Sequence, residues 1–377
     1  MALFWNAALL LSLSVLALKA ELQSTDTQTP KGDPVLGERI AGGLVFEGRL
    51  WLVGTMASSK DRSGGLISLA LANESRQVHF ERGVLDIQKS GHDLWVLRRP
   101  APDGRDFVVS AWRIDRFEEL ARFTTSEKDE PIALSNSANG LTVLSTQAIR
   151  ILSGDKRGWL QVKLQGKLRG GFQETSASPI NGNSIYVGFN TGEWGGGLQQ
   201  VALRTGIVTN VERRDTKELC AGPLNSACDP VTGVISDPQN RECILAAVGL
   251  VHMLSHGRIL RVCGKKVSLV FEKPITIDDG FFKNSKMSEA FFGLVPSADG
   301  GFWGLTSDAL YHFGADGTKK EEYPLPKLAL VSGIYLSREL PGVIVVRTDA
   351  NWAVSLSGYT PLVIPLEEPE PKRELSH

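Results

Sequence analysis

Residues 50–55 read Leu-Trp-Leu-Val-Gly-Thr, a short apolar run in which both alternating faces are hydrophobic. A strand of this kind requires cover above and below, because neither of its faces gains from contact with water. The pattern occurs seven times, each time as a Gly, Asn or Asp turn, an apolar run, a loop and a second alternating run. The seven apolar runs begin at Leu50, Leu94, Leu141, Ile185, Ile244, Phe302 and Val343.

The spacing of the runs indicates a repeat architecture. Their second residues lie at positions 51, 95, 142, 186, 245, 303 and 344, at intervals of 44, 47, 44, 59, 58 and 41 residues. The four shorter intervals match one blade of a propeller, and face-to-face stacking of blades supplies the required cover. The second runs, such as 65–69 and 197–203, are expected to form third strands, and segments such as 76–80 and 207–211 the outer edges. No window offers a capped amphipathic helix, so the sequence predicts an all-β chain.

The Leu/Ile-Trp-Val-Gly-Thr run, followed by Gly-Leu and a polar turn, resembles the repeat of seven-bladed β-propellers of the two-component-regulator or YVTN-like type. The resemblance covers about residues 38–366 and implies a seven-bladed β-propeller. The family includes sensors, scaffolds, lyases and lactone hydrolases, so the fold does not choose among these activities. A pair of β-sandwiches or a barrel is the alternative architecture.

The ends of the chain differ from this repeat. Residues 1–20 contain the apolar run Ala7–Leu18 and small residues suited to cleavage, which predicts a secretory signal peptide. The alternative is an uncleaved anchor, because Met1–Asn6 carries no Lys or Arg. Residues 21–37 are interpreted as a linker and 367–377 as a flexible C-terminal tail. We therefore expect an exported protein, periplasmic or extracellular, with no membrane span after signal cleavage.

Composition narrows the function classes. Among 377 residues, 42% are hydrophobic, and 41 basic residues against 42 acidic ones give a net charge of −1. This composition excludes a mainly disordered chain. The chain also lacks the excess of basic residues that a protein binding the nucleic-acid backbone requires. Neither a P-loop nor a Gly-x-Ser-x-Gly elbow is present in the sequence.

The four cysteines are Cys220, Cys228, Cys243 and Cys263, and none of them forms a Cys-x-x-Cys pair. Cys243 starts one predicted strand and Cys263 ends the next, so the two lie opposite each other across a hairpin. Of the three possible connectivities, this geometry favours disulfides Cys243–Cys263 and Cys220–Cys228. Export makes oxidation plausible, while four buried thiols in a reducing compartment are the alternative.

The loops between second and third strands, and those leading into the next blade, emerge on one face of a propeller. The long intervals arise from insertions on this face, at 215–239 and 274–289. Here the turn 190–197 places Asn190, Glu193 and Trp194 together among glycines. These are candidate ligand or partner residues, although Glu193 in such a turn is also explained by backbone geometry and solvation alone.

Three further candidates belong to the same face. His252 follows an apolar strand and could point to the channel, or could be a hydrogen-bonded structural histidine. Asp278 and Asp279 precede Gly280, where they are either turn formers or oxygen ligands for a hard cation. No family motif matches any of these positions, so catalytic residues and metal ligands remain unassigned.

Two functions are compatible with this pattern. The first is an exported, non-catalytic binding or assembly module that uses the loop-rich face around the channel mouth for a protein or glycan partner, without a cofactor. The alternative is a metal-dependent hydrolase or lyase, lactonase-like, with a divalent cation at the channel mouth. Several carboxylates or histidines converging on one point would favour the second, and an exposed aromatic patch would favour the first.

Overall fold

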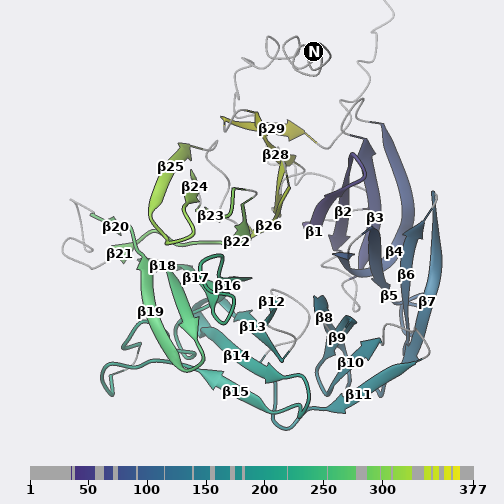
Figure 1. Ribbon diagram of the computed structural model, residues 1–377, viewed down its shortest axis with the longest axis horizontal. Coiled ribbons are helices and arrows are strands. Elements are labelled where there is room, and N and C mark those ends of the chain that lie inside the picture. The colour runs from purple at the N-terminus through teal and green to yellow at the C-terminus, as the bar shows by residue number, and fades with distance from the viewer. Residues whose placement is uncertain are drawn as a thin grey trace, which may run out of the picture. The chain divides into compact units, whose positions relative to one another are not determined.

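In the computed structural model nearly all regular structure is β-strand (Figure 1). The structure describes residues 35, 39–55, 63–70, 75–90, 92–113, 115–137, 140–152, 158–169, 175–180, 183–218, 220–252, 254–276, 287–297, 299–306, 309–324, 335–340, 343–347, 352–357 and 360–365. Among these residues the one helical turn is the 3-10 helix η1, Gly192–Trp194. Gly32–His377 forms one compact unit, to which the following description refers.

The first sheet contains seven antiparallel strands in sequence order. Its strands are β1 (Arg39–Phe46), β2 (Arg49–Thr55), β3 (Gly64–Ala70), β4 (Arg76–Ser90), β5 (Asp93–Arg98), β6 (Asp106–Arg113) and β7 (Arg116–Thr124). The 15-residue strand β4 pairs with β3 through its first half and with β5 through its second half. It therefore ends one group of four strands and begins the next.

Three four-stranded sheets follow in the chain. The first consists of β8 (Pro131–Ser137), β9 (Gly140–Ser145), β10 (Ala148–Leu152) and β11 (Trp159–Lys163). The second consists of β12 (Thr175–Ile180), β13 (Ser184–Asn190), β14 (Gly196–Ala202) and β15 (Val208–Val211). The third consists of β16 (Val231–Ser236), β17 (Ile244–His252), β18 (Leu254–Cys263) and β19 (Lys266–Phe271).

The remaining strands form a two-stranded pair and two four-stranded sheets. The pair is β20 (Pro274–Ile275) with β21 (Met287–Ser288). The next sheet consists of β22 (Leu294–Pro296), β23 (Phe302–Leu305), β24 (Ala309–Phe313) and β25 (Lys319–Pro324). The last consists of β26 (Tyr335–Leu340), β27 (Val343–Arg347), β28 (Trp352–Ser357) and β29 (Thr360–Pro365).

Neighbouring sheets stack on one another through apolar side chains. One buried cluster joins the sheets β8–β11 and β12–β15, and another joins β12–β15 to β16–β19. The inner strand β8 lies beside β4 and β12, β16 lies beside β12 and β22, and β1 lies beside β26 and β27. In Figure 1 the strands β8, β12, β16 and β22 face the middle of the view, whereas β11, β15, β19 and β25 lie at the periphery.

This arrangement explains the sequence pattern. Each of the seven apolar runs lies in the second strand of its group: β2, β5, β9, β13, β17, β23 and β27. Trp51 and Leu52 point to opposite faces of β2, and both side chains are fully buried. The predicted third strands 65–69 and 197–203 correspond to β3 and β14.

The chain ends lie largely outside the described residues. The predicted signal peptide at 1–20 and the tail at 367–377 are among these, as is most of the 21–37 linker. Val35, within the predicted linker, accepts a hydrogen bond from the backbone N–H of Gly65 at 2.9 Å. Within the described part of the chain, no helix has the length and apolar character needed to cross a membrane.

Candidate functional site

The turn between β13 and β14 carries three of the residues selected from the sequence. Asn190 ends β13, and its Oδ1 accepts a hydrogen bond from the Gly192 N–H at 2.9 Å. Thr191 N–H donates to the Gly195 carbonyl at 2.9 Å, and Gly195 N–H donates to the Gly192 carbonyl at 3.0 Å. Asn190 therefore shapes the turn that positions η1, which is a structural use of the side chain.

Three consecutive glycines, Gly195–Gly197, directly follow η1, and we call them the glycine shelf. Their φ angles are +78°, +130° and +81°, in a region that side-chain-bearing residues rarely adopt. A Cβ on Gly195 would lie 2.5 Å from the carbonyl oxygen of Ser226, and a Cβ on Gly197 would lie 2.5 Å from the Cβ of Ser226. Only glycine permits this close approach, so the shelf is fixed against the segment that contains Ser226.

Backbone hydrogen bonds hold the shelf in place. Gly196 N–H donates to the Ser226 carbonyl at 3.1 Å, and Gly197 N–H donates to the Asp229 carbonyl at 2.9 Å. Ser226 and Asp229 belong to the connection between β15 and β16, which begins the neighbouring sheet. The turn between β13 and β14 is thus hydrogen-bonded to the connection between β15 and β16, which leads into the next sheet.

A disulfide closes the loop that supports the shelf. Cys220 and Cys228 are bonded, with their Cα atoms 5.3 Å apart. Inside this loop Cys228 N–H donates to the Asn225 carbonyl at 3.0 Å, and Asn225 N–H donates to Asp229 Oδ2 at 2.7 Å. We name this segment, Cys220–Cys228, the disulfide loop.

An ion pair fastens the disulfide loop to the sheet behind it. Arg258 on β18 contacts Asp229 with Nη2 and Oδ2 2.7 Å apart, and both side chains are largely buried. Arg258 Nε also donates to the Pro223 carbonyl at 2.6 Å. Burial raises the pKa of Asp229 above its ordinary value, although the Arg258 charge opposes this rise. The sequence analysis did not identify this pair, whose members are 29 positions apart in the sequence.

Further charged side chains surround the loop, and they are paired. Glu212 contacts Arg169 at 3.5 Å and Arg214 at 3.0 Å, and it accepts a hydrogen bond from the Ser226 hydroxyl. Arg169 Nη1 donates to the Ser226 carbonyl at 3.2 Å. Ser226 is therefore held by Arg169 and Glu212 as well as by Gly196 of the glycine shelf.

Trp194 projects from this rigid base into solvent. Its side chain is 78% exposed, and Glu193 beside it is exposed as well. The strand β17 lies next to η1, and near its end Val251 is 48% exposed. We call the combination of η1, Gly195–Gly197, the disulfide loop and the end of β17 the Trp194 face.

The other selected residues belong to other segments of the chain. His252 is the last residue of β17 and pairs with Leu254 of β18, so it flanks a hairpin turn, as predicted. Asp278 and Asp279 lie outside the described residues. In the described part of the chain, no three His, Cys, Asp or Glu side chains gather closely enough to hold a metal ion.

A histidine that the sequence analysis did not select has an unusual environment. His79 on β4 stacks on Trp51, with ring centroids 4.5 Å apart, and its Nε2 lies 2.7 Å from the Ser68 hydroxyl. Burial and the nearby Arg49 charge lower the pKa of His79 to about 4. The ring is therefore neutral near pH 7, and the Ser68 hydroxyl that it contacts also accepts a hydrogen bond from Arg49 Nε at 2.8 Å. Because Ser68 is fully buried, this group serves packing between strands.

A second polar cluster lies between sheets. Lys273 Nζ contacts the Tyr311 hydroxyl at 2.6 Å, Glu289 at 2.9 Å and Glu322 at 3.0 Å. The Tyr311 hydroxyl donates to Glu289 at 2.6 Å. Burial, followed by the two carboxylates, raises the pKa of Tyr311 far above its ordinary range. These contacts link Lys273 and Glu289 to Tyr311 and Glu322 of the sheet β22–β25.

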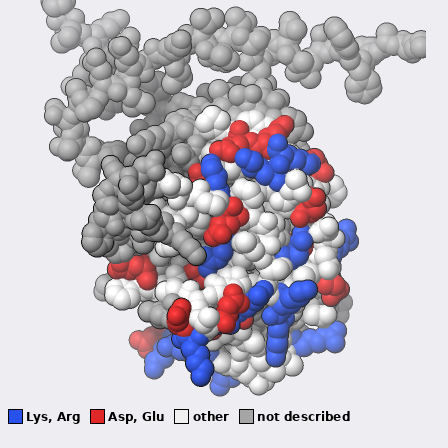
Figure 2. Space-filling view, turned by 90° about the vertical axis from the view of Figure 1, so that its left-hand side faces the viewer, with Lys and Arg blue, Asp and Glu red and all other residues white. Residues whose placement is uncertain are grey.

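The surface charge has no dominant sign on the side shown in Figure 2. Lys and Arg side chains alternate there with Asp and Glu, in agreement with the net charge of −1.

No protein-family model and no curated protein matches this sequence. Solved structures do resemble it. The outer coat vertex of COPII on membranes matches with a TM-score of 0.51 at 10% identity, over 89% of this chain and 86% of that chain. Virginiamycin B lyase from Staphylococcus aureus has a TM-score of 0.49 at 10% identity, over 84% of this chain and 91% of that one.

The β-propeller domain of the Trilobed protease from Pyrococcus furiosus has a TM-score of 0.45 at 9% identity, over 86% of this chain and 93% of that domain. This chain is itself nearly all β-strand, and the structure with a TM-score above 0.5 resembles it in fold. At these identities the likeness concerns the fold alone.

Proposed function

We propose that this protein is an exported, seven-bladed β-propeller that binds a protein partner through the Trp194 face, without catalysis. The strand groups support seven blades. The seven-stranded sheet supplies two, since β4 belongs to both, and the five four-stranded sheets supply one each. The positions of β1 beside β26 and β27 support closure of the ring between the first and last blades. The two disulfides support export to an oxidising compartment.

One observation carries the binding proposal: the chain holds a 78%-exposed indole on a rigid base. An exposed Trp forgoes the free energy that its burial in the core would supply. Three glycines with positive φ and a disulfide restrain the backbone at Trp194, so little backbone entropy is lost when a partner covers the indole. Tryptophan is also among the residues that dominate binding energies at protein interfaces.

The exposure favours a protein over a glycan. A sugar ring stacks on one face of an indole, whereas an indole that is exposed on most of its surface requires a pocket to become buried. Val251 adds a second apolar side chain on the adjacent strand. We therefore infer a partner that presents an apolar pocket complementary to the Trp194 side chain.

The test uses the full chain and two matched variants. Immobilised wild type, Trp194→Ala and Leu160→Ala are incubated with the exported proteins of the source cell, and retained proteins are quantified. Leu160, 62% exposed on the outer strand β11, is the control. We expect one protein to be retained by wild type and Leu160→Ala but lost by Trp194→Ala. With that protein purified, Trp194→Ala should weaken the dissociation constant by about 30-fold or more, as for an interface hot spot.

Equal affinity of wild type and Trp194→Ala would contradict the proposal, and retention of a glycan in place of a protein would correct the partner class.

The metal-dependent hydrolase or lyase is tested separately. The thermal midpoint is measured with EDTA and then with millimolar calcium, magnesium, manganese or zinc. A cation at 100 times its dissociation constant stabilises a fold by about 2.7 kcal/mol. A clear rise in the midpoint would direct the work to lactone and ester substrates.

A further inference from the structure

The two disulfides differ in their exposure to solvent. Cys220 is exposed and Cys243 is fully buried, while their partners Cys228 and Cys263 are both half-buried. Thiol–disulfide exchange requires that a thiolate reach a sulfur atom from outside, so its rate depends on access. An external thiol therefore meets the Cys220 sulfur first.

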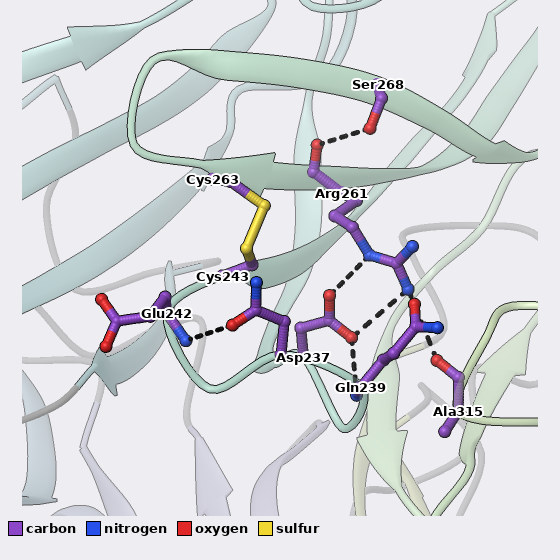
Figure 3. The surroundings of a disulfide bond; sticks show 9 residues. Asp237, Gln239, Glu242, Cys243, Arg261, Cys263, Ser268 and Ala315 are labelled. Atoms are coloured by element: carbon purple, nitrogen blue, oxygen red, sulfur yellow. Dashed lines mark hydrogen bonds and ion pairs between the residues drawn. A yellow bond between two sulfur atoms is a disulfide. The ribbon is translucent and has the colours of Figure 1, made fainter.

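The buried disulfide is surrounded by other restraints. Cys243 directly precedes β17 and Cys263 ends β18, with their Cα atoms 4.4 Å apart (Figure 3). The two strands also pair over nine positions, from Ile244–Val262 to His252–Leu254. Beside them Arg261 Nε donates to the buried Asp237 at 2.5 Å (Figure 3). If this disulfide opened, the backbone hydrogen bonds between β17 and β18 would still keep the two strands in register.

The exposed disulfide has fewer backbone restraints around it: within its loop Leu224 forms one isolated bridge with Arg213, and the Pro223 carbonyl accepts a hydrogen bond from Arg258 Nε. The disulfide loop lies in the connection between β15 and β16, outside any named strand. Cys220 has a φ of +64°, a conformation that costs free energy for a residue with a Cβ. Once its bond to Cys228 opens, Cys220 is free to leave this conformation.

Opening the Cys220–Cys228 bond would affect residues that pack directly against the glycine shelf. Cys228 is preceded by Ser226 and Ala227, the two residues that a Cβ on Gly195 would strike at 2.5 Å. Gly196 N–H is hydrogen-bonded to the same Ser226 carbonyl. A displacement of Ser226 therefore also displaces the glycine shelf, which directly follows Trp194 in the chain.

We propose that Cys220–Cys228 is a thiol–disulfide exchange site that controls the order of the Trp194 face. In the reducing direction, an external thiolate attacks the Cys220 sulfur, forms a mixed disulfide with it and releases the Cys228 thiolate, which takes up a proton. A second external thiol resolves the mixed disulfide, so that one external disulfide forms and both cysteines are reduced. The reductant is a small thiol or a dithiol. The consequence for binding rests on the function proposed above, whereas the change in order does not.

The first measurement compares the two disulfides in the full-length protein. The chain is incubated with increasing dithiothreitol for one fixed, short time, free thiols are alkylated, and the modified cysteines are identified by mass spectrometry. We expect Cys220 and Cys228 to be alkylated at a dithiothreitol concentration at least about tenfold lower than Cys243 and Cys263 require. If Cys243 and Cys263 react first or at the same concentration, the proposal is wrong.

The second measurement follows the face itself. Amide hydrogen exchange of Asn190–Gly197 is compared in oxidised protein, selectively reduced protein, the double variant Cys220→Ser with Cys228→Ser, and the control Cys243→Ser with Cys263→Ser. We expect exchange in this segment to accelerate at least about tenfold on selective reduction and in the first variant, and to stay unchanged in the control. Unchanged exchange in reduced wild type would overturn the proposal, even if a variant failed to fold. Because this readout needs no partner, its outcome is independent of whether Trp194 binds a protein.

Discussion

Two tryptophans occupy opposite environments in this molecule, although both precede a glycine. Trp303 on β23 is 1% exposed and stacks on His312 of β24, with ring centroids 4.2 Å apart and planes inclined by 15°. Trp194 on η1 is 78% exposed. The buried indole stabilises a sheet, whereas the exposed one stands on a base that is itself stabilised by glycines, a disulfide and an ion pair. The difference separates residues that support the fold from those available for recognition.

The buried arrangement occurs in more than one sheet. Trp51 on β2 stacks on His79 in the first sheet much as Trp303 stacks on His312. The polar partners differ, since Ser68 contacts His79 while Asp299 contacts His312 at 3.2 Å. A Trp–His stack is therefore a structural device of these sheets, and Trp194 departs from it.

The largest expected effect comes from Trp303→Ala. Removing a fully buried indole leaves a cavity, and the free energy of unfolding should fall by about 3–5 kcal/mol. The Nε1 atom of Trp303 has no hydrogen-bond partner among the described residues, so the loss comes from packing. Urea denaturation would show a lower midpoint with an unchanged slope. A loss below about 1 kcal/mol would contradict the structural role given to this side chain.

A smaller effect is expected for Gly197→Ala. The new Cβ would meet the Cβ of Ser226 at 2.5 Å, on a backbone with φ +81°, and should lower the free energy of unfolding by about 1–3 kcal/mol. Gly264→Ala is the matched control, since Gly264 has φ +60° and a Cβ added there would meet nothing within 4 Å. Gly197→Ala should also weaken partner binding, and Gly264→Ala should not. Equal losses of stability would mean that the shelf is not tightly packed.

The Trp51–His79 stack predicts a pH dependence. The pKa of His79 is lowered from 6.5 to about 4 in the folded state, so between these values the unfolded chain binds a proton that the folded chain does not. The free energy of unfolding therefore decreases as pH falls from about 6.5 to about 4, and is unaffected by this group above that window. The expected decrease is about 1–2 kcal/mol, because solvent screens a half-buried ring.

Denaturation of wild type and His79→Phe across this range measures the effect. The phenyl ring retains an aromatic side chain beside Trp51 but cannot titrate. The variant should show a flatter dependence of unfolding free energy on pH between 6.5 and 4. The same slope in both proteins would exclude His79 as its source.

The smallest effect on stability is expected for Trp194→Ala. A side chain that is 78% exposed contributes little to folding, so the free energy of unfolding should change by less than about 0.5 kcal/mol. Thermal or urea denaturation beside Trp303→Ala tests this directly. A destabilisation comparable to that of Trp303→Ala would mean that Trp194 supports the fold, and would remove the basis for the binding proposal.

Much of the fold was accessible from local pattern. The second strands, several third strands, the hairpin at His252 and the two cysteine pairings all follow from alternation and short-range spacing. The innermost strands β8, β12 and β16 were not identified, although each pairs with the strand that follows it, because their apolar pattern is less regular. The double use of β4 was missed for a related reason: nothing within a continuous strand marks where its partner changes.

The candidate site was predicted in part. The glycine-rich turn and the cysteine loop were selected because their composition is unusual. The Asp229–Arg258 pair and the contacts of Ser226 were not found, because an Asp in a loop and an Arg on a strand are common and only their proximity gives them meaning. The roles of His252, Asp278 and Asp279 stay predictions.

The sequence by itself determined an all-β repeat, since apolar runs with two hydrophobic faces can be satisfied only between stacked sheets. It also favoured the cysteine pairing that the structure contains, because hairpin register and loop length are local properties. Only the tertiary structure decided that the indole of Trp194 is exposed and that of Trp303 is buried, although each precedes a glycine. The burial of an indole depends on which other strands and loops cover it, and those are set by the folding of the whole chain.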